Sequence, residues 1–176
     1  MNRFALFTDV SLNPQRKLGV GAWLVIPDAY LTAAPGGIAE TEIAGQVRMR
    51  KFKDTSSTKL ELQTVLWALE EFRSGLTASR PGELTIYSDS QCVAGLLKRR
   101  QELERKSFLS GRTHHLLRNT PLYQKFYALY DQCAFTIIPV KGHSPSCSHD
   151  TVHRIFSLVD RQARHELKLW MNELRL

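Results

Sequence analysis

Two acidic residues follow apolar segments that have the length and composition of buried strands. Residues 3–9 read Arg-Phe-Ala-Leu-Phe-Thr-Asp, and residues 84–89 read Leu-Thr-Ile-Tyr-Ser-Asp. We therefore predict strands over 3–9 and 83–87, with Asp9 and Asp89 at their carboxyl ends. A single Asp in such a place is usually a turn residue. A carboxylate at the end of a buried strand is costly unless it is paired or binds a cation, so the repeated pattern favours a functional role.

Two further carboxylates are candidates for the same place because of the helices that carry them. Glu61 falls in the first turn of a helix predicted over 59–73, where its alternative role is to complement the helix dipole. Asp160 follows the inward-facing Leu158 and Val159 in a last helix predicted over 151–174. Converging carboxylates raise each other's pKa unless cations neutralise them. Oxygen ligands without a Cys/His cluster suit Mg²⁺ or Mn²⁺.

The remaining elements follow from apolar periodicity and turn residues. We predict a strand over 19–26 that forms a hairpin with the first, and a half-exposed edge strand over 42–53. Residues 55–58 offer N-caps for the helix over 59–73, whose inward positions are Leu62, Val65, Leu66, Leu69 and Phe72. Helices over 90–97 and 122–130 and a strand over 134–140 complete the chain. This order predicts an α/β domain with one mixed sheet.

Composition limits the class of protein. The 176 residues are enough for one domain with a full core, and 43% of them are hydrophobic. No apolar run approaches the roughly 20 residues of a membrane span, and the N-terminus lacks the pattern of a signal peptide. Three cysteines without a CxxC pair indicate a reducing compartment, so we expect a cytoplasmic protein that does not bind membranes.

Positive charge is concentrated in one segment. The formal net charge is +7, and residues 98–118 contain seven basic residues against Glu102 and Glu104. A basic segment of this kind is typical of a protein that binds nucleic acid, and its alternative is a solvated charged face. The helix predicted over 122–130 carries an aromatic face that we assign to the core rather than to base stacking, formed by Tyr123, Phe126, Tyr127 and Tyr130.

Four short segments together resemble the type 1 ribonuclease H family. They are Phe7-Thr8-Asp9-x-Ser11, Lys59-Leu60-Glu61-Leu62, Tyr87-Ser88-Asp89-Ser90-Gln91 and Val140-Lys141-Gly142-His143, and they occur in the family's order over nearly the whole chain. The resemblance implies a ribonuclease H-like fold, in which helices flank both faces of a five-stranded mixed sheet. It also implies Mg²⁺-dependent hydrolysis of the RNA strand of RNA–DNA hybrids.

The resemblance assigns roles to individual residues. Two Mg²⁺ ions would be bridged by Asp9, with Glu61 and Asp89 completing one shell and Asp160 helping to hold the ion that activates water. His143 would assist proton transfer or product release. Substrate contacts are implied for Gln91, which would read the minor groove, and for a set of other residues: Ser11, Asn13, Ser57, Thr58, Lys98, Arg99, Arg100, Arg105 and Lys106.

The chain departs from the family pattern at several positions. Val10 replaces a glycine that lets the backbone approach substrate. Ser57 and Thr58 occupy positions where the family usually has asparagines, so hybrid selectivity is expected to differ. The interval from His143 to Asp160 is longer than usual and contains Asp150, a rival for the fourth carboxylate. We choose Asp160 because Asp-Arg-Gln-Ala resembles the family's Asp-x-x-Ala segment.

Three hypotheses follow. The first is a monomeric, cytoplasmic endoribonuclease that acts on hybrids with Mg²⁺, or with Mn²⁺. The second is a nuclease or resolvase of the same fold that acts on DNA. The third is a nucleic-acid-binding module without turnover, which would bind in a salt-dependent way but cleave nothing.

Overall fold

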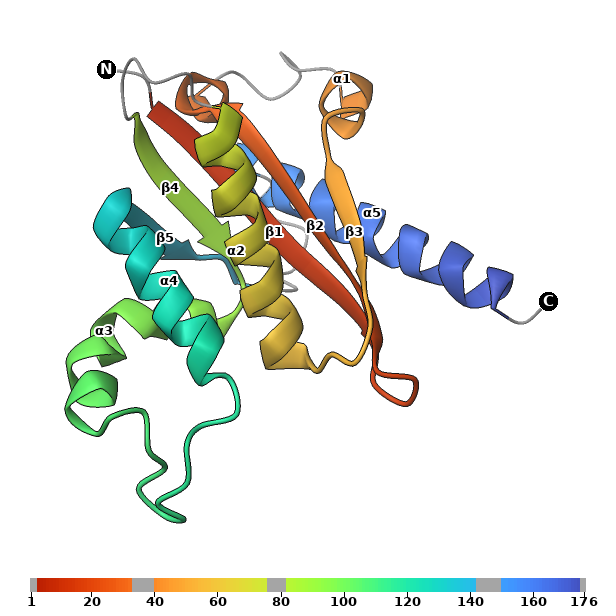
Figure 1. Cartoon of the computed structure of the whole chain (residues 1–176). Helices are drawn as coiled ribbons and strands as arrows, with labels where there is room; N and C mark the ends of the chain where they lie inside the picture. Colours follow the sequence, from red (N-terminus) through yellow and green to blue (C-terminus); the bar gives the residue numbers. More distant parts are fainter. Residues whose placement is uncertain (1–2, 33–39, 76–81, 142–149, 175–176) are drawn as a thin grey trace.

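A five-stranded mixed sheet forms the centre of the molecule. Figure 1 shows the computed structural model, which describes residues 3–32, 40–75, 82–141 and 150–174. The strand order is β3-β2-β1-β4-β5. The strands are β1 (Arg3–Asn13), β2 (Leu18–Pro27), β3 (Arg48–Phe52), β4 (Glu83–Ser88) and β5 (Phe135–Pro139). The β1–β2 and β2–β3 pairs are antiparallel, whereas β1–β4 and β4–β5 are parallel. The predicted mixed sheet is confirmed.

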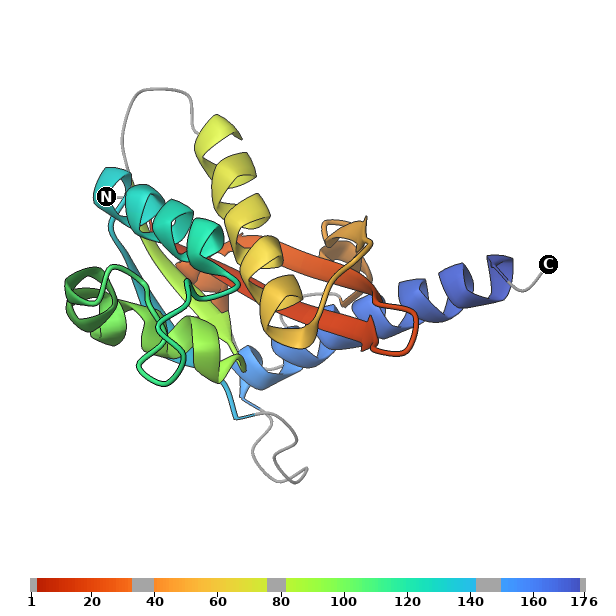
Figure 2. The same ribbon diagram turned by 60° about the horizontal axis from the view of Figure 1, so that its bottom comes forward.

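Helices cover both faces of this sheet, as predicted. The helical elements are η1 (Asp28–Thr32), α1 (Glu40–Ala44), α2 (Ser57–Gly75), α3 (Gln91–Arg105), α4 (Thr120–Gln132) and α5 (Thr151–Glu173). Two separate groups of buried side chains join them to the sheet, one under α2, α3 and α4 and the other under α5. Figures 1 and 2 show α2 and α4 on the face opposite α5. In the described part of the chain, no helix is long and apolar enough to span a membrane.

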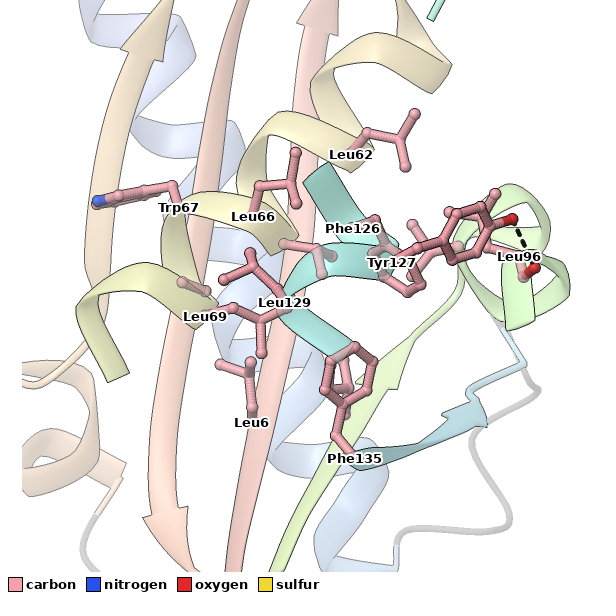
Figure 3. Close-up of a cluster of buried hydrophobic side chains, with 14 of the residues drawn as sticks. Leu6, Leu62, Leu66, Trp67, Leu69, Leu96, Phe126, Tyr127, Leu129 and Phe135 are labelled. Carbon is pink, nitrogen blue, oxygen red and sulfur yellow. Dashed lines mark hydrogen bonds between the residues drawn. The ribbon is translucent and has the colours of Figure 1, made fainter. Parts of the chain in front are cut away.

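The core under α2 and α4 follows from apolar residues at helical spacing. All five inward positions predicted for α2 are buried, from Leu62 to Phe72. The aromatic face of α4 packs against them, with Phe126 fully buried and the Tyr127 hydroxyl donating to the Leu96 carbonyl oxygen at 2.9 Å (Figure 3). Burying a side chain of this size stabilises the fold by about 1.5–3 kcal/mol. The assignment of this face to the core is confirmed.

Two glycines on β2 let α2 lie unusually close to the sheet. A Cβ atom on Gly21 would overlap the Thr64 side chain, and one on Gly19 would overlap Leu60. Because Glu61 lies in the same turn as Leu60, this close approach also brings Glu61 toward the strands. The packing of the helix therefore positions a candidate site residue.

Three predicted elements differ from the structure by more than two residues at an end. Strand β1 continues past Asp9 to Asn13, because its second half still pairs with β2. The segment 42–53 is not one strand: α1 occupies 40–44, where Ile43 is buried under α5, and β3 covers only 48–52.

Helix α3 is longer than predicted and takes up part of the segment expected to be irregular. It continues to Arg105 because Val93, Leu96 and Leu103 give it a buried face. Pairs four residues apart, Arg100–Glu104 and Glu102–Lys106, support the polar face.

Candidate active site

Asp9 and Asp89 lie side by side where the parallel ladder ends. The last described pair of that ladder is Phe7 with Tyr87, so two further residues along each chain bring Asp9 beside Asp89. Asp9 is in the middle of β1 rather than at its end, and it still pairs with Ala22 of β2. The carboxyl end of a parallel pair is a common place for a ligand in α/β sheets.

Burial and neighbouring carboxylates dominate the electrostatics of Asp9. The residue is 8% exposed, and its Oδ1 accepts a hydrogen bond of 2.8 Å from the Val10 backbone N–H. Its pKa is raised from 3.8 to about 8, first by burial, then by the charge of Asp89, with smaller contributions from Asp160. The Val10 hydrogen bond opposes this rise. Three carboxyl groups therefore meet at Asp9.

Glu61 lies on the other side of the same pocket. The pocket is lined by Thr8, Asp9, Val10, Glu61, Thr64, Ser88 and Asp89. Ser90 donates to Glu61 Oε2 at 2.5 Å, and Ser57 donates to Oε1 at 3.2 Å. Helix α2 begins at Ser57, so Glu61 lies just beyond the first turn, and the prediction that placed it inside that turn was wrong.

Ser90 has two roles that sequence reasoning did not assign. Besides donating to Glu61, its Oγ accepts the backbone N–H of Val93 at 3.2 Å and so caps α3. The available signal for the cap was a serine directly after Asp89, at the first position of the helix predicted over 90–97. The contact with Glu61 joins residues 29 positions apart and had no local signal.

The structure places the two rival carboxylates in different environments. Asp160 contacts Asp9 and is held by Arg164, whose Nε donates to Oδ1 at 2.7 Å. Asp150 instead caps α5, where its Oδ1 accepts the His153 backbone N–H at 2.8 Å. Partial burial acts to raise the pKa of Asp150, but the hydrogen bonds from His153 outweigh it and the pKa is lowered. Of the two rivals, Asp160 is thus the one that contacts Asp9.

The described side chains of the pocket do not form a complete ligand shell for a metal ion. Among the described residues, no three His, Cys, Asp or Glu side chains are placed to hold one metal ion. Instead, Val10, Ser90 and Arg164 each bond one of the site carboxylates. His143 lies outside the described residues.

The polar residues predicted to contact substrate have different settings in the fold. Ser57 and Thr58 open α2, and Gln91 is exposed at the first position of α3. Ser11 is half-buried on β1. Asn13 is occupied within the fold, because its Oδ1 accepts the Arg16 backbone N–H at 3.0 Å and its amide contacts the Met171 sulfur.

The basic residues of α3 divide into paired and exposed groups. Arg100 binds both Asp131 and Glu104, and its guanidinium carbon lies 5.1 Å from the centre of the Tyr127 ring. Lys106 pairs with Glu102. Lys98, Arg99 and Arg105 are exposed. Arg100 and Lys106 therefore stabilise the helix region, whereas the other three remain candidates for binding a polyanion.

Comparison with known proteins agrees with this fold. The sequence model of the RNase H family matches residues 1–165. LC9-RNase H1, a type 1 RNase H with the type 2 active-site motif, has a similar structure: the TM-score is 0.62 at 18% identity, covering 93% of this chain and 73% of that one. The foamy viral protease-reverse transcriptase, in complex with dsDNA, gives a TM-score of 0.58 at 11% identity, covering 92% and 93%. No curated protein matches the chain.

The family match covers most of the chain, and the two structural likenesses show the same fold. The chain belongs to the RNase H family. It is an endoribonuclease of the ribonuclease H type, and family and fold together imply hydrolysis of RNA in RNA–DNA hybrids.

Proposed function

We propose that the protein cleaves the RNA strand of RNA–DNA hybrids endonucleolytically, with two Mg²⁺ ions held by Asp9, Glu61, Asp89 and Asp160. The observation that carries this proposal is the meeting of Asp9, Asp89 and Asp160 where the parallel ladder ends. Their mutual repulsion contributes to the raised pKa of Asp9. A divalent cation relieves such repulsion, because it stabilises the ionised carboxylates.

The donor set fits Mg²⁺. Among the described residues, the pocket lining offers carboxylate and hydroxyl oxygens and neither histidine nor cysteine, and oxygen ligands suit Mg²⁺ and Mn²⁺. Mg²⁺ usually keeps several waters and uses one or two carboxylates together with substrate phosphates. The described residues include no preformed group of three ligands, which agrees with this coordination preference of Mg²⁺. We expect Mn²⁺ to support activity as well.

Each carboxylate has a distinct proposed role. Asp9 would hold both ions, Glu61 and Asp89 would complete one shell, and Asp160 would help to hold the other. Bound metal supplies an activated water and stabilises the charge on the leaving 3′ oxygen. The chain itself orients the ligands: Ser90 holds Glu61, and Arg164 holds Asp160.

The surroundings of the pocket are proposed to bind the hybrid. Gln91, Ser57 and Thr58 lie at the first turns of α3 and α2, beside Asp89 and Glu61, and would contact the RNA strand together with Ser11. Asn13 would join them only by giving up its side-chain contacts with Arg16 and Met171. Lys98, Arg99 and Arg105 would contact phosphates. We further propose that His143 assists proton transfer or product release, and that the protein acts as a cytoplasmic monomer.

A cleavage assay with three substrates tests the proposal. Wild-type protein and Asp89→Asn are incubated with an RNA–DNA hybrid, duplex DNA and branched DNA, with Mg²⁺ or with EDTA. We expect Mg²⁺-dependent cleavage of the RNA strand by wild type alone. Preferred cleavage of either DNA substrate would support the nuclease or resolvase hypothesis. Binding of the hybrid by an inert wild-type protein would support the module without turnover.

A further inference from the structure

Three basic side chains lie on the side of the acidic pocket away from α3. They are Arg16 and Lys17 in the β1–β2 turn and Lys53 directly after β3, and we call them the turn-side surface. In Figures 1 and 2 the β1–β2 turn (red) and the connection between α3 and α4 (green) lie on opposite sides of the start of α2. The turn-side surface is therefore separate from the basic segment 98–118.

Backbone hydrogen bonds hold the turn-side surface in place. Asn13 Oδ1 accepts the Arg16 backbone N–H at 3.0 Å, and the Thr55 backbone N–H donates to the Lys17 carbonyl oxygen at 3.1 Å. The antiparallel register pairs Gly19 with Phe52, so Lys53 follows on beside the start of β2. Two chain segments that are distant in sequence are thus fixed together, with their basic side chains on one surface.

The three side chains differ from the basic residues that support the fold. Each is exposed, and none forms an ion pair with a carboxylate in the described parts of the chain. Lys51, by contrast, binds both Glu166 and Glu173. A lysine or arginine that supports no internal contact retains its full charge for an external anion.

The turn-side surface continues directly into the candidate active site. After Lys53 the chain passes through the exposed Asp54 to Thr55, which is buried and hydrogen-bonded to Gln63 of α2. Two residues further on, Ser57 donates to Glu61. A strand whose phosphate lies at the Glu61 side of the pocket would therefore have further phosphates within reach of this surface. Three separate exposed cations suit a repeating polyanion, because each can neutralise one phosphate.

We propose that Arg16, Lys17 and Lys53 bind the phosphate backbone of the hybrid on the side of the pocket opposite α3. The substrate would then be held on both sides of the cleavage position. This inference rests on the proposed function, since it assumes that the acidic pocket receives a phosphate of the same nucleic acid.

The test measures binding rather than cleavage. The variant Arg16→Gln, Lys17→Gln, Lys53→Gln is compared with wild type by fluorescence anisotropy, using a labelled RNA–DNA hybrid in EDTA across a series of salt concentrations. We expect weaker binding and a slope of log K against log salt that falls by roughly three, about one for each lost phosphate contact. The circular dichroism spectrum and Tm should stay unchanged, because the replaced side chains support no described contact.

A second triple variant controls for net charge. It removes three exposed cations outside the turn-side surface and the pocket lining, and its substitutions are Arg73→Gln on α2, Lys125→Gln on α4 and Lys168→Gln on α5. Lys125 differs from the other two because it pairs with Glu70. We expect the salt slope of this control to stay close to that of wild type. Equal slopes for the two triple variants, or an unchanged slope for the turn-side variant, would overturn the inference.

The outcome can be separated from a failure of the proposed function. Cleavage by wild type together with an unchanged turn-side slope would remove this inference alone. An inert wild type whose binding depends on the three turn-side residues would remove the proposed catalysis and leave the turn-side surface as a binding site.

Discussion

The acidic pocket and the basic helix α3 are both dense in charge, yet the two regions balance it differently. At the pocket, Asp9 lies within the fields of Asp89 and Asp160, and its pKa rises to about 8. On α3, Arg100 is matched by Asp131 and Glu104, and Lys106 by Glu102. Like charges are crowded in one region, whereas opposite charges are paired in the other.

This difference distinguishes charged residues with a functional role, at the pocket, from charged residues that stabilise the fold, on α3. Paired surface ions add little stability each and leave no charge for a ligand. Crowded carboxylates destabilise the metal-free protein, and such a cost is expected at a site that a cation later occupies. Substitutions in the two regions should therefore have effects of opposite sign.

The largest expected effect is at Asp9. Its folded pKa of about 8 lies above its ordinary value of 3.8, so between these values the folded chain keeps a proton that the unfolded chain has lost. Stability consequently falls as pH rises through this window, by at most about 1.4 kcal/mol per pH unit for this group. Asp9→Asn does not titrate, so in EDTA it should be more stable than wild type by several kcal/mol at pH 8 and nearly equal at pH 4. Urea unfolding across this pH range measures the difference.

Asp131→Asn is the matched control for that measurement. Asp131 is exposed and its pKa is lowered by hydrogen bonds from Arg100, so its replacement should not stabilise the protein at any pH between 5 and 9. A gain for Asp131→Asn as large as that for Asp9→Asn would show that removing any one carboxylate, rather than the crowding at the pocket, explains both. No gain for Asp9→Asn at pH 8 would contradict the crowding of carboxylates at the pocket.

The next effect distinguishes the two rival carboxylates. Asp160→Asn should lower hybrid cleavage at least about 100-fold, because a metal ligand contributes several kcal/mol to charge stabilisation in the transition state. Asp150→Asn should keep cleavage within about threefold, since this residue caps α5 and Asn is also a good N-cap. Single-turnover cleavage rates at saturating Mg²⁺ measure both. The reverse order would make Asp150 the ligand and would require α5 to begin differently.

A smaller effect is expected at Ser90, which connects Glu61 to the first turn of α3. Ser90→Ala removes the cap and should cost about 1 kcal/mol of stability. It also removes the donor to Glu61, so cleavage should fall and require more Mg²⁺. Ser57→Ala removes the longer contact to Glu61 without a cap and should affect both quantities less. Equal Mg²⁺ requirements in Ser90→Ala and wild type would show that Ser90 serves only as a cap.

The sequence predicted most of the fold because its elements are locally consistent. Apolar spacing alone identified the buried faces of α2 and α5, and the order of elements identified the mixed sheet. The errors lie where tertiary pairing overrides the local pattern. For example, the local pattern predicted that the first strand ends at Asp9. In the structure Asp9 pairs with Ala22, and the residues after Asp9 continue to pair with β2.

The site was predicted as a set of residues rather than as a set of contacts. The carboxylate types and their order pointed to Asp9, Glu61, Asp89 and Asp160, but which atoms meet depends on the sheet register and on how closely α2 packs. The hydrogen bond from Ser90 to Glu61 and the mutual charge effects at Asp9 join distant segments. Sequence spacing contains no information of that kind.

The smallest expected effects lie within α3, where neighbouring arginines should separate binding from stability. Arg100→Gln removes two ion pairs and the contact with Tyr127, so it should lower Tm by about 1–3 °C and leave hybrid binding nearly unchanged. Arg99→Gln removes an exposed charge, so it should leave Tm unchanged and lower the salt slope by about one. Thermal unfolding and anisotropy titrations on both variants provide the comparison. A larger loss of binding in Arg100→Gln than in Arg99→Gln would contradict the comparison. An arginine that is ion-paired within the protein would then also bind the substrate, so ion pairing would not identify the residues that serve stability alone.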